Sequence, residues 1–442
     1  MFSYNSRCKM VIPPFSHDGV MRYGKFVPRL YNLCRSLDFT PGKIMPARAF
    51  CADENQGYPI IQLTKHFGTF LFNHGRAGGV LATDRHGPHA HHGKDLLILQ
   101  ASHVGYDPDS GQFGTYRRIH TEHKDCRPTC GKINAIIKPY QEEYRFASEN
   151  TLLRKRGDDF LMTIDNQLLK ESREEGLFLK MERFIATHGD GTWQGVQVHS
   201  TAKTYRLIPT AVERLGEQNF PSEGAACIGS NLPADWFYYK REPERIRQDK
   251  QHLDHNLFTV MPQIVTAPAP MLAAAQVNTM VEFDSTFRTI VKTNAYQSQK
   301  VLLVSGVNID ISPNHDEVFP LTKFAPWAAY YKDEHGVGQV WEQTELVERL
   351  MAQPLENPEE FLGISHIESR PVVTDLVDAL ARHRPARLAE ERHRPAFGAK
   401  PALEPTGLGA LSGTVDAFEY YEHSEMYFYI PLFKNLTFLI LD

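Results

Sequence analysis

The spacing of apolar residues changes along the chain, and each spacing predicts a different kind of element. Phe26, Leu30, Leu33 and Leu37 recur at helical spacing, so residues 1 to about 50 are predicted to be mostly helical. Leu96 to Leu99 form a short apolar run between polar residues, which is typical of a buried strand in a parallel sheet. Val301 to Val304 repeat this strand signal in the second half of the chain. The pattern therefore favours an α/β fold.

The segments between and after these strands predict helices, a linker and a final strand region. Residues 139 to about 185 are charged and periodic, so we expect helices that pack on the sheet. The stretch 370–412 is rich in Ala, Arg and Pro and predicts a helix followed by an exposed linker. The end of the chain, from Met426, predicts one or two strands. We therefore expect two domains, residues 1–220 and an α+β region at 221–442 whose role the sequence does not indicate.

The two strand segments resemble each other. KDLLILQASHVGYDP and QKVLLVSGVNIDISP share a strand, a small residue and a turn that ends in Pro, and aligning them places His103 opposite Asn308. The similarity has two interpretations. One is a degenerate internal repeat, and the other is chance likeness between two strand-and-turn segments.

Composition and charge exclude several classes of protein. The 442 residues are 42% hydrophobic and 23% charged, which excludes a mostly disordered or fibrous chain. A net charge of -5 leaves no electrostatic footprint for a nucleic acid. The longest uncharged stretch, Asn256 to Val281, contains three prolines, and the first residues lack the apolar core of a leader peptide. We therefore expect a cytoplasmic protein with no membrane insertion.

Six cysteines are too few for a disulfide scaffold in a chain of this length, so we expect free thiols or metal ligands. Cys51, His103 and Cys130 together would make a three-ligand zinc site with a fourth position left for water, as in catalytic zinc centres. His103 also follows a predicted buried strand, where ligands of α/β sheets gather. The alternatives are that each cysteine is a small buried hydrophobe and His103 a turn residue, or that Cys126 and Cys130 form a metal-free pair.

The motifs around these residues resemble those of a known family. Cys51-Ala-Asp-Glu, a Gly-rich stretch, an apolar strand followed by His103 and Asp107, then an arginine and Cys130-Gly are similar in order to the limiting-CO2-inducible B/C family of β-type carbonic anhydrases. This family is related to the Cys-Gly-His-rich theta class. The resemblance covers about residues 45–135. It implies a β-carbonic-anhydrase-like sheet flanked by helices, a Zn²⁺ cofactor, reversible hydration of CO2 to bicarbonate, and a homodimer.

The resemblance also implies residue roles. Cys51, His103 and Cys130 fall on the zinc ligands, Asp53 on the catalytic aspartate, and Arg118 on its arginine partner, with Arg117 and Arg85 as alternative partners. Asp53 would orient the hydroxide nucleophile, and Arg118 would keep Asp53 ionised. The alternative roles are a helix N-cap for Asp53 and a solvated surface residue for Arg118.

A histidine cluster adds a further hypothesis. His89, His91 and His92, with His86 beside them, could relay protons away from the site or bind a second metal, because the pKa of histidine suits proton transfer. The alternative interpretation is an exposed polar loop.

Two other functions fit the same motifs. One is a catalytically silent zinc-binding scaffold or regulator in inorganic-carbon handling, and some members of the family bind zinc without activity. The other is a zinc hydrolase with a larger substrate, whose general base would lie among the residues from His86 to His92.

Overall fold

A computed structural model describes most of the first 356 residues, and the ranges that it describes are 12–81, 95–118, 126–164, 177–179, 185, 196–198, 204–237, 239, 253–313 and 321–356. These residues belong to one compact unit, Met1–His383. The predicted helix and linker at 370–412, the strands expected after Met426 and the histidine cluster near residue 90 lie outside the described residues.

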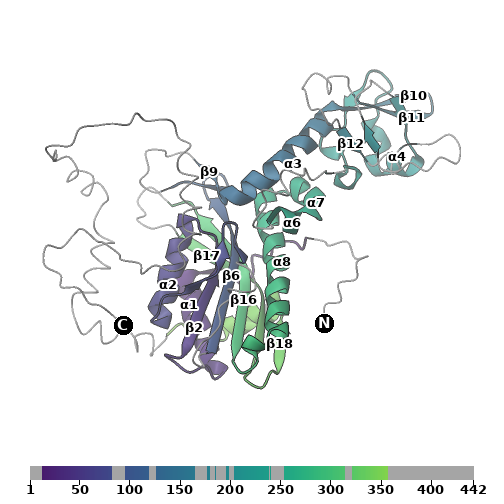
Figure 1. Ribbon diagram of the computed structural model, residues 1–442. Coiled ribbons are helices and arrows are strands. Elements are labelled where there is room, and N and C mark those ends of the chain that lie inside the picture. The colour runs from purple at the N-terminus through teal and green to yellow at the C-terminus, as the bar shows by residue number, and fades with distance from the viewer. Residues whose placement is uncertain are drawn as a thin grey trace, which may run out of the picture. The chain divides into compact units, whose positions relative to one another are not determined.

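The described residues form an eight-stranded mixed sheet (Figure 1). Six strands follow one another in the order β1 (Met21–Arg22), β17 (Leu321–Lys332), β16 (Val301–Ile311), β6 (Asp95–Asp107), β2 (Ile44–Ala49) and β3 (Phe72–Asn73). The four strands from β16 to β3 are parallel, and β1, β17, β18 (Gly338–Trp341) and β7 (Gln112–Phe113) pair antiparallel with their neighbours. The predicted α/β sheet with parallel strands is confirmed.

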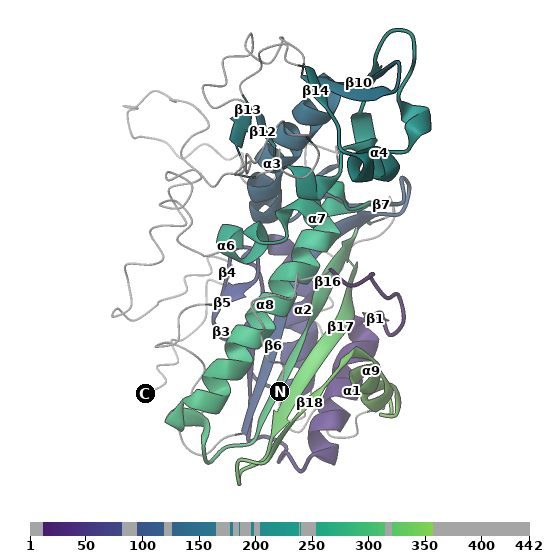
Figure 2. The same cartoon turned by 90° about the vertical axis from the view of Figure 1, so that its right-hand side faces the viewer.

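Alternate residues of the buried strands face different helices, because successive side chains of a strand point to opposite sides of a sheet. Leu97 and Leu99 pack with α1 (Tyr23–Ser36), α2 (Gly57–Phe67) and α9 (Gln343–Met351). Leu96 and Ile98 pack on the other side with Phe283 and Ile290 of α8 (Pro270–Lys292). Figure 2 shows α8 running along the face of the sheet formed by β6 and β16. The run Leu96–Leu99 is therefore apolar without interruption because helices cover both faces of the sheet.

The remaining elements are short or lie outside this sheet. A second, antiparallel sheet has the order β14 (Thr204–Arg206), β11 (Asp159–Ile164), β10 (Thr151–Arg156) and β15 (Ala226–Cys227). Three strand pairs join β4 (Gly75–Arg76) to β5 (Val80–Leu81), β8 (Thr115–Tyr116) to β9 (Arg127–Pro128), and β12 (Leu177–Leu179) to β13 (Val196–Val198). The other helices are α3 (Gly131–Asn150), α4 (Pro209–Leu215), α6 (Leu253–Phe258), α7 (Met261–Thr266) and the 3-10 turns η1 (Glu54–Gln56), η5 (Glu217–Asn219), η6 (Gly229–Asn231), η7 (Ala234–Trp236) and η8 (Asn294–Tyr296).

Two element predictions are wrong. Residues 44–49, inside the region expected to be mostly helical, form the strand β2, because they pair between β6 and β3. Of the range 139–185 expected to be helical, the described residues are helical only to Asn150, and residues 151–164 form the β10–β11 hairpin. The hairpin turns at Gly157 and Asp158, and Gly157 adopts φ +60°, a conformation that suits a two-residue turn.

The boundary expected near residue 220 does not divide the central sheet. β16 and β17 come from the second half of the chain, yet β16 pairs with β6 from the first half along eleven residue pairs. This pairing places Asn308 beside His103, which is the register obtained by aligning the two strand segments. Both halves of the chain therefore build the sheet that carries the site.

The uncharged stretch from Asn256 to Val281 does not form one helix. It contributes to α6, α7 and α8, and Pro262 and Pro270 lie at the first positions of the last two, where proline is tolerated. None of the helices in the described ranges is long and apolar enough to span a membrane.

Candidate metal centre

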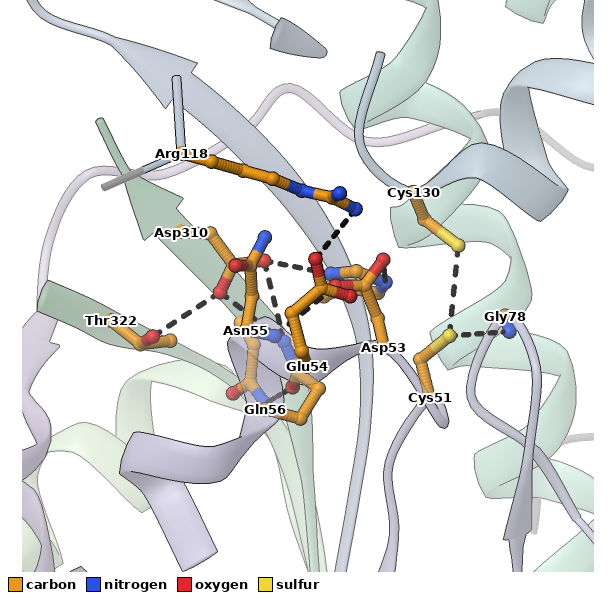
Figure 3. Close-up of polar contacts among 12 residues, drawn as sticks. Cys51, Asp53, Glu54, Asn55, Gln56, Gly78, Arg118, Cys130, Asp310 and Thr322 are labelled. Carbon is orange, nitrogen blue, oxygen red and sulfur yellow. Dashed lines mark hydrogen bonds and ion pairs between the residues drawn. The ribbon is translucent and has the colours of Figure 1, made fainter. Parts of the chain in front are cut away.

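Three potential metal ligands converge at one end of the parallel strands. One ligand atom each from Cys51, His103 and Cys130 lies within 4.8 Å of the other two, and all three side chains are buried. The Sγ atoms of Cys51 and Cys130 are 3.7 Å apart (Figure 3). The structure thus brings together the three residues on which the sequence prediction of a metal site depends.

The parallel strands explain why residues far apart in sequence meet here. Cys51 lies two residues past the end of β2, and His103 belongs to β6, the neighbouring parallel strand. Cys130 immediately precedes the first residue of α3. His103 lies within β6 and not after it as expected, because β6 continues past the end of β2. The chain that leaves β2 therefore brings Cys51 to the level of His103.

Two glycines let the neighbouring backbone approach the thiol of Cys51. Gly78 donates its N–H to the Sγ of Cys51 at 3.0 Å, as Figure 3 shows. Gly78 and Gly79 have φ values of +86° and +77°, and a Cβ atom on Gly79 would lie 2.5 Å from the carbonyl oxygen of Ala101. Only glycine fits both the conformation and the space.

The imidazole of His103 is held on one side and lacks a partner on the other. Its Nδ1 lies 2.7 Å from Oδ2 of Asp310, and neither side chain is exposed to solvent. Its Nε2 is buried and has no hydrogen-bond partner among the described residues. Because the carboxylate can only accept, Nδ1 carries a proton, and Nε2 is the nitrogen left to bind a metal once it gives up its own proton.

The charges of the three groups depend on one another. The hydrogen bond with Cys130 lowers the pKa of Cys51 to about 3 against the opposing effect of burial, and His103 lowers it further. The same hydrogen bond, together with burial, raises the pKa of Cys130. Burial lowers the pKa of His103, but Cys130 and Asp310 outweigh burial and bring it well above its ordinary value. The pair of thiols therefore releases its first proton readily, and a thiolate is already present for a cation to bind.

The donor set fits zinc. Two thiol sulfurs and one imidazole nitrogen are typical zinc ligands, and three protein ligands leave a fourth tetrahedral position. The partnerless Nε2 of His103 is the strongest sign that a group belongs here, since a buried nitrogen without a partner is costly. A bound cation would satisfy both sulfurs and this nitrogen.

Behind His103 lies a buried polar network that sequence reasoning missed. Asp310 accepts hydrogen bonds from Gln56 at 3.2 Å and from Thr322 at 3.2 Å. The Oε1 of Gln56 in turn accepts from the amide of Asn308 at 2.6 Å. The signal for it was the strand alignment, which already placed Asn308 beside His103, two residues before Asp310.

Asp53 caps a helical turn and also lies beside the candidate ligands. Its Oδ1 accepts from the backbone N–H of Asn55 at 3.1 Å, so it caps η1. Its Oδ2 lies 4.0 Å from Nε2 of His103, at the edge of the buried site, where its side chain is 19% exposed. Burial raises the pKa of this carboxyl to about 6. Asp53 therefore stands between the three ligands and solvent.

The arginine prediction needs a correction. Arg118 forms its ion pair with Glu54, the neighbour of Asp53, as Figure 3 shows, and Arg117 pairs with Asp109 at 2.9 Å. The side chain of Asp53 is turned inward by its cap, whereas that of Glu54 is 59% exposed and free to meet Arg118. The third alternative, Arg85, and the relay histidines His89, His91 and His92 lie outside the described residues, so those hypotheses stay predictions.

Comparisons with known proteins agree with these motifs. Residues 20–183 match the family model of the limiting CO2-inducible proteins B/C, beta carbonic anhydrases. The solved structure of PtLCIB4, described as a homolog of the limiting CO2-inducible protein LCIB, is 12% identical with a TM-score of 0.42, over 74% of this chain and 95% of that one. The structure of LCIB itself is 12% identical with a TM-score of 0.35, over the same shares of the two chains. No curated protein matches the chain.

Proposed function

Since residues 20–183 belong to the family of limiting CO2-inducible proteins B/C, we propose that this protein is a zinc-dependent carbonic anhydrase that converts CO2 and water reversibly into bicarbonate and a proton. The family resemblance seen in the sequence is confirmed over this segment. The observation that carries the proposal is the buried Cys51–His103–Cys130 group, with the Nε2 of His103 partnerless among the described residues.

The chain's own residues have distinct tasks in this proposal. Cys51, Cys130 and Nε2 of His103 would hold the zinc ion, and Asp310 would fix the ring of His103. When bound, zinc supplies Lewis acidity that lowers the pKa of water toward 7, so that hydroxide is available to attack the carbon of CO2. Two thiolates donate more charge to zinc than three imidazoles do, so they lower the pKa of water less. Hydrogen bonds around the ligands must then supply the rest of the effect.

Asp53 is the candidate group for handling the proton. It lies beside the Nε2 of His103 and is partly open to solvent, so it can accept a hydrogen bond from the nucleophile on one side and exchange a proton with water on the other. Burial raises its pKa to about 6, close to neutral pH, which suits a group that takes up and releases protons. A homodimer and a cytoplasmic location complete the proposal and rest on the resemblance and the composition.

A second function is favoured by the same position of Asp53. A carboxylate 4.0 Å from the histidine ligand atom is near enough to turn toward a metal and fill its fourth position. The protein would then bind zinc without hydrating CO2 and act as a scaffold or regulator. The zinc hydrolase hypothesis depends on histidines outside the described residues, and no described residue favours it.

Stopped-flow CO2 hydration on purified protein with its zinc content quantified tests the proposal. Cys51→Ala should lose both zinc and turnover. Cys34→Ala is the matched control, because Cys34 is equally buried but lies in α1, in a cluster that does not include the three ligands. Zinc-dependent turnover that survives in Cys34→Ala and disappears in Cys51→Ala would support the enzyme. One zinc per chain without turnover would favour the scaffold, and a wild-type protein that binds no zinc would refute both.

A further inference from the structure

A buried asparagine on α8 contacts the neighbours of two of the three candidate ligands, Cys51 and His103. The amide nitrogen of Asn278 donates to the carbonyl oxygen of Gly78 at 3.1 Å and to the hydroxyl of Ser102 at 2.8 Å. Gly78 is the residue whose N–H donates to the thiol of Cys51, and Ser102 directly precedes His103 on β6. One side chain thus touches the backbone support of two candidate ligands.

The hydrogen bonds fix the orientation of this amide. A backbone carbonyl can only accept, so the nitrogen of Asn278, and not its oxygen, faces Gly78. The oxygen accepts from the amide of Asn256 at 2.9 Å, and that amide also donates to the carboxylate of Glu282 at 2.6 Å. Both hydrogens and the oxygen of Asn278 are therefore used, and the residue is fully buried. Such a satisfied network holds its members in one arrangement.

The two faces of β6 explain how this contact acts on the site without touching it. Ser102 points toward α8, and the next residue, His103, points to the opposite face, because side chains of a strand alternate. Asn278 therefore holds β6 from behind while His103 faces the other ligands. It holds the turn at Gly78 in the same way, so that the N–H of this residue points at Cys51.

We propose that Asn278 is a positioning residue of the metal centre, which sets the placement of the Gly78 N–H against the Cys51 thiolate and of His103 on β6. Loss of its amide would free the carbonyl of Gly78 and loosen the turn that also carries the N–H of this residue. The hydrogen bond to Cys51 would then lengthen and change the strength with which this sulfur donates to a metal. Residues that hold ligands in this way typically change metal affinity by roughly tenfold to a hundredfold when they are replaced. This assigns α8, which lies outside the segment matched by the family model, a part in metal binding.

The inference rests on the proposed metal site but not on catalysis. Asn278→Leu removes all of these hydrogen bonds at similar volume. The matched control is Thr279→Val, because Thr279 is the next residue of α8, is equally buried, and loses one hydrogen bond to the carbonyl of Gly306 on β16. Both variants would be loaded with Co²⁺, whose thiolate-to-metal and d–d absorption bands report the geometry of the site. Competition with a chromophoric chelator would give the affinity for Zn²⁺, and the midpoint of thermal unfolding would give the stability of each variant.

We expect Asn278→Leu to weaken Zn²⁺ binding roughly tenfold or more and to shift the Co²⁺ bands, whereas Thr279→Val loses thermal stability with unchanged bands and affinity. Wild-type bands and affinity in Asn278→Leu, or equal changes in both variants, would overturn the inference. If Asn278→Leu does not fold, Ser102→Ala replaces it in the test. This variant removes only the contact to Ser102 and keeps the one to Gly78, so we expect Zn²⁺ affinity to fall by roughly threefold. An unchanged Zn²⁺ affinity in Ser102→Ala would overturn the inference. A wild-type protein that binds zinc without hydrating CO2 would refute the proposed enzyme and leave this test intact.

Discussion

Replacing Asp310 by asparagine should weaken zinc binding about tenfold while leaving the fold intact. Asp310 keeps its shape in this change but loses its charge and exchanges one accepting oxygen for a donating NH₂ group. Its present neighbours all donate: Nδ1 of His103 at 2.7 Å, Oγ1 of Thr322 at 3.2 Å, and Nε2 of Gln56 at 3.2 and 3.3 Å from its two oxygens. The new NH₂ group would then face Nε2 of Gln56, which can only donate, while the hydroxyl of Thr322 can turn to accept from it.

The network leaves this conflict without an easy remedy. Gln56 could present its oxygen instead of its nitrogen, but that oxygen already accepts from Asn308 at 2.6 Å. The amide of Asn308 is fixed in turn, because its oxygen accepts from the hydroxyl of Tyr23 at 2.7 Å. All of these side chains are buried, so water cannot replace a lost partner at low cost. The charge that faces His103 is lost in every arrangement, and this loss weakens the hold on its ring.

The magnitude follows from the kind of bond that is lost. A hydrogen bond to a charged group contributes about 1.5–3 kcal/mol and one between neutral groups about 0.5–1.5 kcal/mol. The difference for the His103–Asp310 contact is therefore about 1–1.5 kcal/mol, and about 1.4 kcal/mol corresponds to a factor of ten in affinity.

Competition between the protein and a chromophoric chelator for Zn²⁺ measures this factor. Thr322→Val is the control, since it removes one donor to Asp310 but preserves the charge facing His103, so its affinity should stay within about threefold of wild type. If Asp310→Asn binds zinc as tightly as wild type with an unchanged circular dichroism spectrum, or if Thr322→Val weakens binding as much, the argument from charge is refuted.

Three further predictions concern the site itself. Cys51→Ala, His103→Ala and Cys130→Ala should each strip most of the zinc in a metal assay, and a variant with full zinc content would show that its residue is not a ligand. In metal-free protein the folded state holds the Asp53 proton more tightly than the unfolded chain, because its pKa rises from 3.8 to about 6. The free energy of unfolding, measured by urea titration, should therefore fall by up to about 3 kcal/mol from pH 4 to 6. Asp53→Asn should lack this fall, so unfolding free energies of wild type and variant that change with pH in the same way would contradict the prediction. Arg118→Ala should change the free energy of unfolding by less than about 1 kcal/mol and leave CO2 hydration intact, because the ion pair of Arg118 with Glu54 is exposed. A loss of turnover in Arg118→Ala equal to that in Asp53→Ala would instead support Arg118 as the partner of Asp53.

The ligands could be predicted from the sequence because their surroundings are local. Cys51 and Cys130 each lie in a short motif, and His103 lies four residues after the apolar run Leu96–Leu99, whose strand character is evident without a partner. From the residues alone, a metal site was one of several hypotheses. The resemblance of the order of the motifs to that of a known family favoured the metal site over the others. Convergence of the three side chains agrees with that choice.

The secondary structure between the motifs was harder to predict because local signals competed with tertiary packing. Residues 44–49 contain a proline and an arginine and lack a long apolar run, yet they form β2 because β6 and β3 pair with them on both sides. The segment after Asn150 has charged residues at intervals that also suit an exposed helix. Its Gly157–Asp158 turn decides for a hairpin, since glycine at positive φ ends a helix and suits a tight turn.

The support of the site escaped sequence reasoning because it comes from the other half of the chain. Asp310 is 207 residues from His103, and Asn278 is 200 residues from Gly78, so no local motif joins them. The pairing of β6 with β16 and the packing of α8 on β6 create these contacts. A segment treated as a separate region of unknown role thus completes the site.

A physical signal of this support was nevertheless present in the sequence. The run that begins at Val301 predicts a buried strand, yet it continues into Asn308 and Asp310, and burying a carboxylate without partners costs far more than a strand gains from it. Such a residue in a buried strand must be paired, and a near partner is a polar group on the same face of a neighbouring strand. The alignment of the two strand segments placed His103 opposite Asn308, two residues from Asp310 and therefore on the same face of the sheet. Polar residues that interrupt a buried strand therefore indicate where a second strand contributes to a site, even when the two lie in different halves of the chain.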